Sequence, residues 1–227
     1  MSETPRTQST KKYIRPKDAA TLVLLRRTNG GAEILMGRRK QNHVFMPNVF
    51  VFPGGRVDSA DARVRAATEL RDEIRDQLTQ SCSERRARTL ALSAIRETAE
   101  ETGLLVGVAA DIKQKENLPA VWHSFDVAGL APALDQLDYV ARAITPPGNP
   151  RRFHARFFTT DGDNAQGSLI GDGELDELAW IPIDDVKDLP TAWITRFVTN
   201  EVKQRLDGHA VRRPIPVIKF RKIVEYD

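Results

Sequence analysis

The chain has 227 residues, 41% of them hydrophobic, and its 34 Lys and Arg residues against 31 Asp and Glu residues give a formal net charge of +3. This length supports a sizeable hydrophobic core, and the small basic excess suits an anionic small molecule without calling for nucleic acid. A single cysteine, Cys82, excludes an internal disulfide framework, and no run of about 18 apolar residues predicts a membrane span.

The amino-terminal residues 1–18 are polar and lack the apolar core of a signal peptide. We therefore expect a flexible lead-in at residues 1–18, a single domain at residues 19–227, and a cytoplasmic location. The lone cysteine fits a reducing compartment of this kind.

The first elements predicted are a β-hairpin and a third short strand. Residues 20–27 and 33–39 are rich in strand-forming side chains, and a glycine-containing turn joins them. The run at residues 49–52 leads directly into Pro53, Gly54 and Gly55. The two glycines permit either a plain tight turn or a close approach of the backbone to a ligand.

Residues 61–102 contain no Gly or Pro and are rich in Ala, Arg, Glu and Leu, which predicts two helices with a break near residues 79–83. Gly103 is expected to end the second helix. Further along, the pattern predicts a mixed order of elements: strands near 104–108, 139–145, 153–159 and 178–183, a helical region at 119–137, and a last helix at 191–206. In the terminal segment, 191–227, apolar and basic residues alternate after the helix, which suggests a docked edge strand or a contact in a homodimer.

Three glutamates, Glu97, Glu100 and Glu101, fall within an arc of roughly 100° on the second predicted helix. Glu97 and Glu101 repel one another at this spacing, and Arg96 offsets only part of the repulsion by reaching Glu100. The cluster is either a solvated helix face or a set of oxygen ligands for a hard divalent ion such as Mg²⁺. The neighbouring face is expected to turn to the core through Ala91, Ala94, Ile95 and Thr98.

The stretch RETAEETGL at residues 96–104 resembles the second half of the sequence box of the Nudix hydrolase superfamily. Gly55 and Asp61 match the first half, with Asp61 at the position of the family's glutamate. The long spacing from Gly55 to Arg96 indicates a helical insert at about residues 62–93 inside the box. Together with residues 45–58 and 144–158, the insert looks like the branch that includes coenzyme A and acyl-CoA diphosphatases, although His154 and Ala155 stand where that branch usually has Asp and Thr.

This resemblance implies an α/β/α sandwich with a mixed β-sheet and a reaction that depends on Mg²⁺ or Mn²⁺. It implies that Glu97, Glu100 and Glu101 are both catalytic residues and metal ligands, although Glu97 could instead orient or deprotonate the attacking water. Arg96 would fix a glutamate carboxylate through its planar guanidinium. The residues implied in substrate binding are Arg38, Gly54, Gly55, Arg151 and Arg152.

The function implied is a pyrophosphohydrolase that cleaves a nucleoside diphosphate linked to another moiety, with CoA or acyl-CoA first among the substrates. ADP-ribose and NADH are alternatives within the family. A non-catalytic module that binds a nucleotide or RNA is the alternative from another class, suggested by the insert and the basic tail.

Other residues give weaker signals. Glu174 and Glu177 belong either to a polar surface loop or to a site in which one of them acts as a general base. The four histidines, His43, His123, His154 and His209, have no spacing typical of a zinc site. The tryptophans, Trp122, Trp180 and Trp193, are expected in the core or in an interface.

Overall fold

The computed structural model of the chain describes residues 14–41, 47–171, 173–206 and 214–227. The lead-in predicted for residues 1–18 therefore falls mostly outside the described residues, as do His43 and His209. Among the residues that the structure does describe, no helix is both long enough and apolar enough to cross a bilayer.

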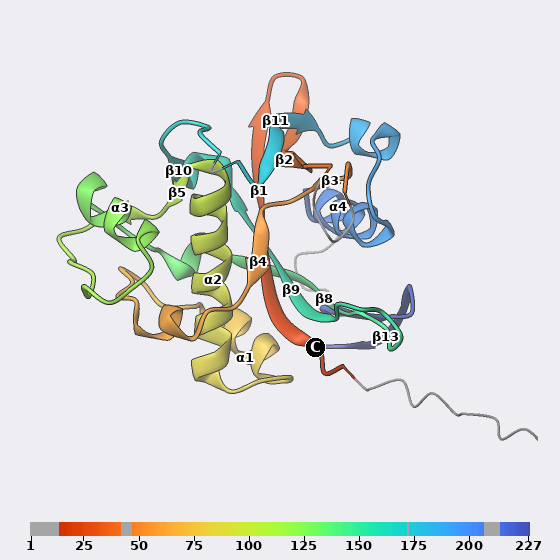
Figure 1. Cartoon of the computed structure of the whole chain (residues 1–227), viewed down its shortest axis with the longest axis horizontal. Coiled ribbons are helices and arrows are strands. Elements are labelled where there is room, and N and C mark those ends of the chain that lie inside the picture. Colours follow the sequence, from red (N-terminus) through yellow and green to blue (C-terminus); the bar gives the residue numbers. More distant parts are fainter. Residues whose placement is uncertain (1–13, 42–46, 172, 207–213) are drawn as a thin grey trace, which may run out of the picture.

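A mixed sheet of nine strands forms the centre of the fold (Figure 1). Its main path runs in the order β11-β2-β1-β9-β8-β12-β13, with β3 paired to β2 and β4 paired to β1. The pairs β1–β9 and β8–β12 are parallel, and the other pairs are antiparallel. The strands are β1 (Lys17–Thr28), β2 (Gly31–Arg39), β3 (Phe50–Val51), β4 (Gly54–Arg56), β8 (Asp138–Ile144), β9 (Phe153–Asp161), β11 (Leu175–Pro182), β12 (Pro216–Lys219) and β13 (Lys222–Tyr226).

Helices cover both faces of this sheet, so the predicted α/β/α arrangement is confirmed (Figure 1). The helices are α1 (Asp72–Thr79), α2 (Glu84–Thr102) and α3 (Val121–Ala128) on one side and α4 (Trp193–Leu206) on the other. Alternate residues of β1 serve the two cores: Leu22 and Leu24 pack with the α2 side, whereas Val23 packs with the α4 side. Such alternation is what a strand buried on both faces requires.

Shorter elements make up the rest of the secondary structure in the described residues. They are four 3₁₀ turns, η1 (Ser59–Arg63), η2 (Leu134–Gln136), η3 (Gly162–Asn164) and η4 (Asp185–Asp188), and two small ladders, β5 (Leu105–Val106) with β10 (Ala165–Gln166) and β6 (Val108–Ala109) with β7 (Leu130–Ala131). The terminal hairpin β12–β13 joins the sheet through β8, as the docked edge strand predicted from the alternating pattern.

Both ends of helix α2 are set by capping residues that can be recognised in the sequence. The Ser83 side chain accepts a hydrogen bond from the Arg86 amide, which satisfies one free N–H at the start of the helix. Gly103 adopts the left-handed conformation with φ 77° and ends the helix, as predicted. The face expected in the core is fully buried, at Ala91, Ala94, Ile95 and Thr98.

The expectation that two helices with one break account for residues 61–102 was partly wrong. The break near residues 79–83 is present, but the first helix is only α1, and residues 64–71 are not helical. Tertiary hydrogen bonds override the helix-forming composition here: the Ala67 amide donates to the Pro132 carbonyl (2.8 Å), and Thr68 bridges to Ala133. The helical region expected at 119–137 is likewise reduced to α3 and the turn η2.

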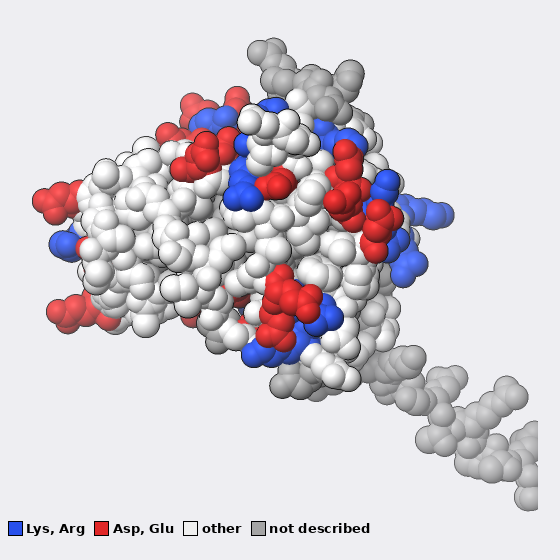
Figure 2. All heavy atoms as spheres, turned by 90° about the horizontal axis from the view of Figure 1, so that it is seen from above, with Lys and Arg blue, Asp and Glu red and all other residues white. Residues whose placement is uncertain are grey.

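Positive and negative side chains are mixed on the surface. On the face shown in Figure 2, Lys and Arg side chains lie beside Asp and Glu side chains in small separate groups. No single sign of charge dominates this face, which is the distribution expected of a domain with nearly balanced charges.

Two glycines that end helices provide a matched test of crowding. A Cβ at Gly103 would lie 2.8 Å from the Ser168 carbonyl oxygen, whereas a Cβ at Gly129 would have nothing within 4 Å; both residues have positive φ. We expect Gly129→Ala to lower the free energy of unfolding by about 1 kcal/mol, the cost of the left-handed conformation alone. Gly103→Ala should cost at least about 1 kcal/mol more because of the backbone clash. Urea denaturation of both variants measures the difference, and equal losses would contradict the packing described for Gly103.

Candidate active site

The carboxylate cluster lies in the last turns of α2 and is organised by one arginine. Arg96 donates from Nη2 to Glu97 Oε1 (2.7 Å) and from Nη1 to Glu100 Oε2 (2.6 Å). The Arg96 side chain is only 7% exposed, compared with 33% for Glu100. The planar guanidinium therefore holds two of the three glutamates, in the geometry expected for this residue.

Asp61 holds Arg96 from the opposite side and is completely buried. Its carboxylate accepts from Arg96 Nε (3.0 Å), from Ser93 Oγ (2.7 Å) and from Trp122 Nε1 (3.0 Å). Three donors saturate this acid and point it away from solvent. Asp61 therefore positions Arg96, and the glutamates lie on the far side of the guanidinium.

The glycine turn at β4 packs directly against the glutamates. The Gly54 amide donates to Glu101 Oε2 at 2.9 Å. A Cβ at Gly55 would lie 2.3 Å from Glu97 Oε2, so any side chain there would displace the carboxylate. Since β4 pairs with β1 through Thr21 and Ala20, the sheet fixes the distance between this turn and α2. A close approach of backbone to carboxylate is thus the reason for the two glycines.

Two glutamates of the cluster hold their protons unusually strongly. Burial raises the pKa of Glu97 to about 7, with Glu100 and Asp61 adding to the shift and Arg96 opposing it. Burial also raises the pKa of Glu101 to about 8, against the Gly54 hydrogen bond and with help from Glu97. For Arg96, burial alone would lower the pKa, but Glu97 and Asp61 raise it above its ordinary value. The cluster thus contains more negative charge than Arg96 alone can neutralise.

A divalent cation fits this donor set. Within residues 14–41, 47–171, 173–206 and 214–227, no three carboxylate, His or Cys side chains converge at metal-binding distance as they lie. The glutamates are turned to Arg96 and to the Gly54 amide instead. Their oxygens are nevertheless the ligand type that Mg²⁺ and Mn²⁺ prefer, and buried acids with raised pKa values would be relieved by a cation.

Of the two arginines that end β2, Arg39 rather than Arg38 lies near the cluster. Arg38, predicted to bind substrate, forms an ion pair with Glu177 on β11. Burial lowers the pKa of Arg39, an effect opposed by the charges of Glu101 and Glu174. Glu174 therefore shares the electrostatic environment of Glu101, whereas Glu177 is engaged by Arg38. Successive residues of a strand point to opposite faces of the sheet. The sequence pattern did not show whether Arg38 or Arg39 points toward the carboxylate cluster.

The other predicted substrate residues, Arg151 and Arg152, lie elsewhere. Arg151 is exposed, whereas Arg152 is buried and donates to the carbonyls of Thr145 (3.0 Å) and Ile14 (2.6 Å). Arg152 lines a cavity at the beginning of β1 and β9, beside the amino-terminal end of α2. The glutamates lie near the opposite end of that helix, so the structure does not gather all the predicted residues in one place.

The tryptophans and the remaining histidines have separate environments. Trp122 is fully buried and contributes to the site through Asp61, a role that no sequence motif indicated. Trp180 is partly buried beneath Arg26, whose guanidinium carbon lies 4.4 Å from the ring centroid, and Trp193 is 37% exposed. His123 faces Asp126 at 3.6 Å, and His154 belongs to the cavity of Arg152.

Two curated proteins are similar to the chain in sequence. No family model matches the chain. The chain is 28% identical to putative nudix hydrolase 7 of Caenorhabditis elegans over 174 residues, covering 73% of this chain and 51% of the relative. It is 28% identical to the acyl-coenzyme A diphosphatase NUDT19 of Xenopus laevis over 142 residues, covering 44% of this chain and 37% of the relative. The chain thus spans about half or less of the length of these curated relatives.

The fold of the chain is also similar to that of a solved structure. The crystal structure of a NUDIX hydrolase from Alicyclobacillus acidocaldarius superposes with a TM-score of 0.64 and 28% identity, covering 82% of this chain and 90% of that one. The agreement includes the mixed sheet and the flanking helices. In both sequence and fold, the chain is therefore similar to hydrolases of the Nudix superfamily.

The buried contact between Asp61 and Arg96 predicts a large effect of a small substitution. Asp61→Asn removes the charge opposite Arg96 and presents an N–H₂ group to a site with three donors. We expect a loss of about 3 kcal/mol or more in the free energy of unfolding, because a buried guanidinium loses a partner. Asp58→Asn is the control: Asp58 caps η1 at the surface, and asparagine caps equally well, so its effect should stay within about 0.5 kcal/mol. Denaturant titration compares the two, and similar stabilities would contradict the role given to Asp61.

Proposed function

We propose that this protein is a divalent-metal-dependent pyrophosphohydrolase that cleaves a nucleoside diphosphate linked to another moiety. The observation that carries the proposal is the cluster of Glu97, Glu100 and Glu101, held by Arg96 and backed by the Gly54–Gly55 turn. CoA or acyl-CoA is the first candidate substrate, supported by the similarity to an acyl-coenzyme A diphosphatase of Xenopus laevis.

The chemistry required is the neutralisation of a doubly anionic diphosphate and the activation of water beside it. Glu97, Glu100 and Glu101 would hold Mg²⁺ or Mn²⁺, which when bound supplies charge neutralisation and polarises a phosphoryl oxygen. Arg96 sets the positions of Glu97 and Glu100, and Asp61 fixes Arg96. Arg39 adds a partly buried positive charge near Glu101 that suits an anionic substrate.

Two acids are candidates for the base that takes the proton from water. Glu97, whose pKa lies at about 7, can accept a proton near neutral pH. Glu174 is exposed and lies within the electrostatic reach of Glu101 and Arg39. A base must lie within hydrogen-bonding reach of the attacking water, so the position of that water relative to Glu97 and Glu174 decides between them.

The direct test offers the purified protein CoA, acyl-CoA, ADP-ribose and NADH with Mg²⁺ or Mn²⁺ and identifies the products by mass. We expect phosphoanhydride cleavage of at least one, and a fall in kcat of roughly 100-fold or more for Glu100→Gln and Glu101→Gln, because each substitution removes a charged ligand. The matched control is Glu84→Gln, an exposed glutamate in the first turn of the same helix, which should retain full activity.

The outcomes separate the candidate functions. No cleavage of any substrate, or cleavage equal in all three variants, would argue decisively against the proposed enzyme. Tight binding of a nucleotide without turnover would instead favour the binding-module alternative. Loss of Mn²⁺ binding in Glu100→Gln, followed by electron paramagnetic resonance, reports the metal site independently of turnover.

A second variant tests the glycine turn rather than the acids. In Gly55→Ala, the new Cβ would meet the Glu97 carboxylate at 2.3 Å, a contact relieved only by moving that flexible side chain. We expect kcat to fall about 100-fold from the misplaced carboxylate, with little change in thermal stability. Gly30→Ala, whose Cβ would have its nearest neighbour at 3.8 Å, should leave kcat unchanged. Full activity in Gly55→Ala would exclude Glu97 from the reaction.

A further inference from the structure

A cavity of about 590 Å³ lies at the other end of α2, away from the carboxylate cluster. It opens where β1 and β9 begin and where β8 and β12 end, and the segment just before α2 closes one side. Arg86, which donates to the lining residue Asp18, is separated from Glu97 by eleven positions on the helix, or roughly 16 Å at 1.5 Å per residue. The volume is within the range of small-molecule sites.

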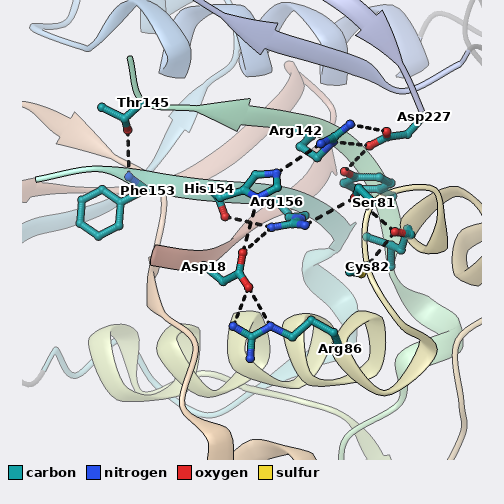
Figure 3. Close-up of polar contacts among 12 residues, drawn as sticks. Asp18, Ser81, Cys82, Arg86, Arg142, Thr145, Phe153, His154, Arg156 and Asp227 are labelled. Atoms are coloured by element: carbon teal, nitrogen blue, oxygen red, sulfur yellow. Dashed lines mark hydrogen bonds and ion pairs between the residues drawn. The ribbon is translucent and has the colours of Figure 1, made fainter. Parts of the chain in front are cut away.

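The charges that line this cavity are mostly positive. Four of the lining residues carry a permanent positive charge, against a single carboxylate, Asp18; they are Arg15, Arg152, Arg156 and Lys219. Asp18 is already shared, since its Oδ2 accepts from Arg86 (2.6 Å) and its Oδ1 accepts from Arg156 (2.7 Å), as Figure 3 shows. One carboxylate divided between two guanidinium groups leaves the cavity with a net positive charge.

Arg156 is the most deeply buried of these cations, at 1% exposure. Its Nη1 bonds to Asp18 and to the His154 carbonyl, and its Nη2 lies 3.4 Å from Ser81 Oγ. Its Nε is buried and has no acceptor among the described residues. An unpaired donor on a buried guanidinium is costly, so the protein leaves the positive charge of Arg156 incompletely compensated, and a nearby anion would be attracted to it.

His154 lies in the same positively charged environment, beside Arg142 and Arg156 (Figure 3). Its Nε2 lies 3.3 Å from Arg142 Nη1 and its Nδ1 lies 3.6 Å from Asp18 Oδ1. Burial, followed by the charges of Arg156, Arg142 and Lys219, lowers the pKa of His154 to about 4, against the opposing effect of Asp18. The imidazole is therefore neutral near pH 7, where its ring can still form a hydrogen bond to a ligand.

The walls of the cavity add two further features. Ser81 and Cys82 border it just before α2, so the positive end of a 19-residue helix dipole lies beside it. Apolar surface is also present, contributed by Ile144, Pro146, Pro147 and Phe220. The combination suits a ligand with an anionic head and an apolar body.

We propose that this cavity is a second binding site, which takes a phosphate group, either as inorganic phosphate or as a phosphomonoester. The phosphate is attracted by the positive charges of Arg156, Arg15 and Lys219, which all line the cavity. The organic part of a monoester rests on the proline and phenylalanine wall. This site does not depend on the hydrolytic reaction proposed above, since no lining residue belongs to the carboxylate cluster.

Isothermal titration calorimetry of the whole protein in EDTA tests the site, with inorganic phosphate and phenyl phosphate as probes. EDTA removes divalent ions that would otherwise recruit phosphate to the glutamates. We expect saturable binding, weakened roughly tenfold or more in Arg15→Gln/Lys219→Gln, because each removed cation takes away a charge-assisted contact. Arg15 is exposed and the Lys219 side chain is 37% exposed, so both can be replaced without breaking the buried ion pairs.

Lys187→Gln is the matched control, an exposed lysine in η4 that does not line the cavity. It should bind both probes as the unmodified protein does. Tighter binding of phenyl phosphate identifies a monoester as the ligand, and equal binding identifies free phosphate. Absence of saturable binding of both probes at millimolar concentration, or equal binding by the double variant and Lys187→Gln, would overturn the proposal, whether or not the protein hydrolyses any substrate.

Discussion

The buried guanidinium of Arg96 is the group on which the arrangement of the carboxylates depends. It bonds to Asp61 on one side and to Glu97 and Glu100 on the other, while its Nη2 also donates to the Arg56 carbonyl (2.9 Å). One planar group thus links the 3₁₀ turn η1, the strand β4 and two positions of α2. A lysine could not replace it, because the three donors of one compact ammonium cannot span the four acceptor groups that the planar guanidinium meets.

Strand β1 contacts residues near both ends of α2 and so fixes their positions relative to one another. Toward the carboxylate cluster, Ala20 and Thr21 pair with the glycines of β4. Toward the cavity, Asp18 pairs with His154 of β9 and bonds to Arg86 of the helix. Because β1 is also the strand whose alternate residues fill both hydrophobic cores, a shift of its register by one residue would disturb the core and both sites together.

The elements that local chemistry specifies were predictable from the sequence. The Gly103 stop of α2, the hairpin at β1 and β2 and the buried face with Ala94 and Ile95 follow from conformational preference and periodicity. Residues 64–71 were wrongly expected to be helical, because the bonds that hold them, such as Ala67 to Pro132, join positions far apart in the chain. Long-range pairing of this kind leaves no local pattern.

The residues of the candidate site were likewise only partly predictable from the sequence. The glutamates, Arg96 and the glycine turn lie in a recognisable box, and the structure brings them together. Trp122 and Ser93 were not predicted as site residues. They are connected with the site only by their hydrogen bonds to Asp61, which form in the folded chain. The cavity with Arg156 was also missed, because its lining residues come from five separate segments of the chain.

The dipole of α2 relates the two sites to one another. Acids near the carboxyl end of a helix oppose its dipole, and no basic residue lies in the last turn of α2 to offset Glu100 and Glu101. The fold compensates in part with Arg96 and the Gly54 amide, and burial leaves the remaining charge poorly solvated. A cation therefore gains more at this end of the helix than at a solvated cluster, whereas the same dipole favours an anion in the cavity beside Ser81 and Cys82. The dipole of one helix thus favours opposite signs of charge at its two ends.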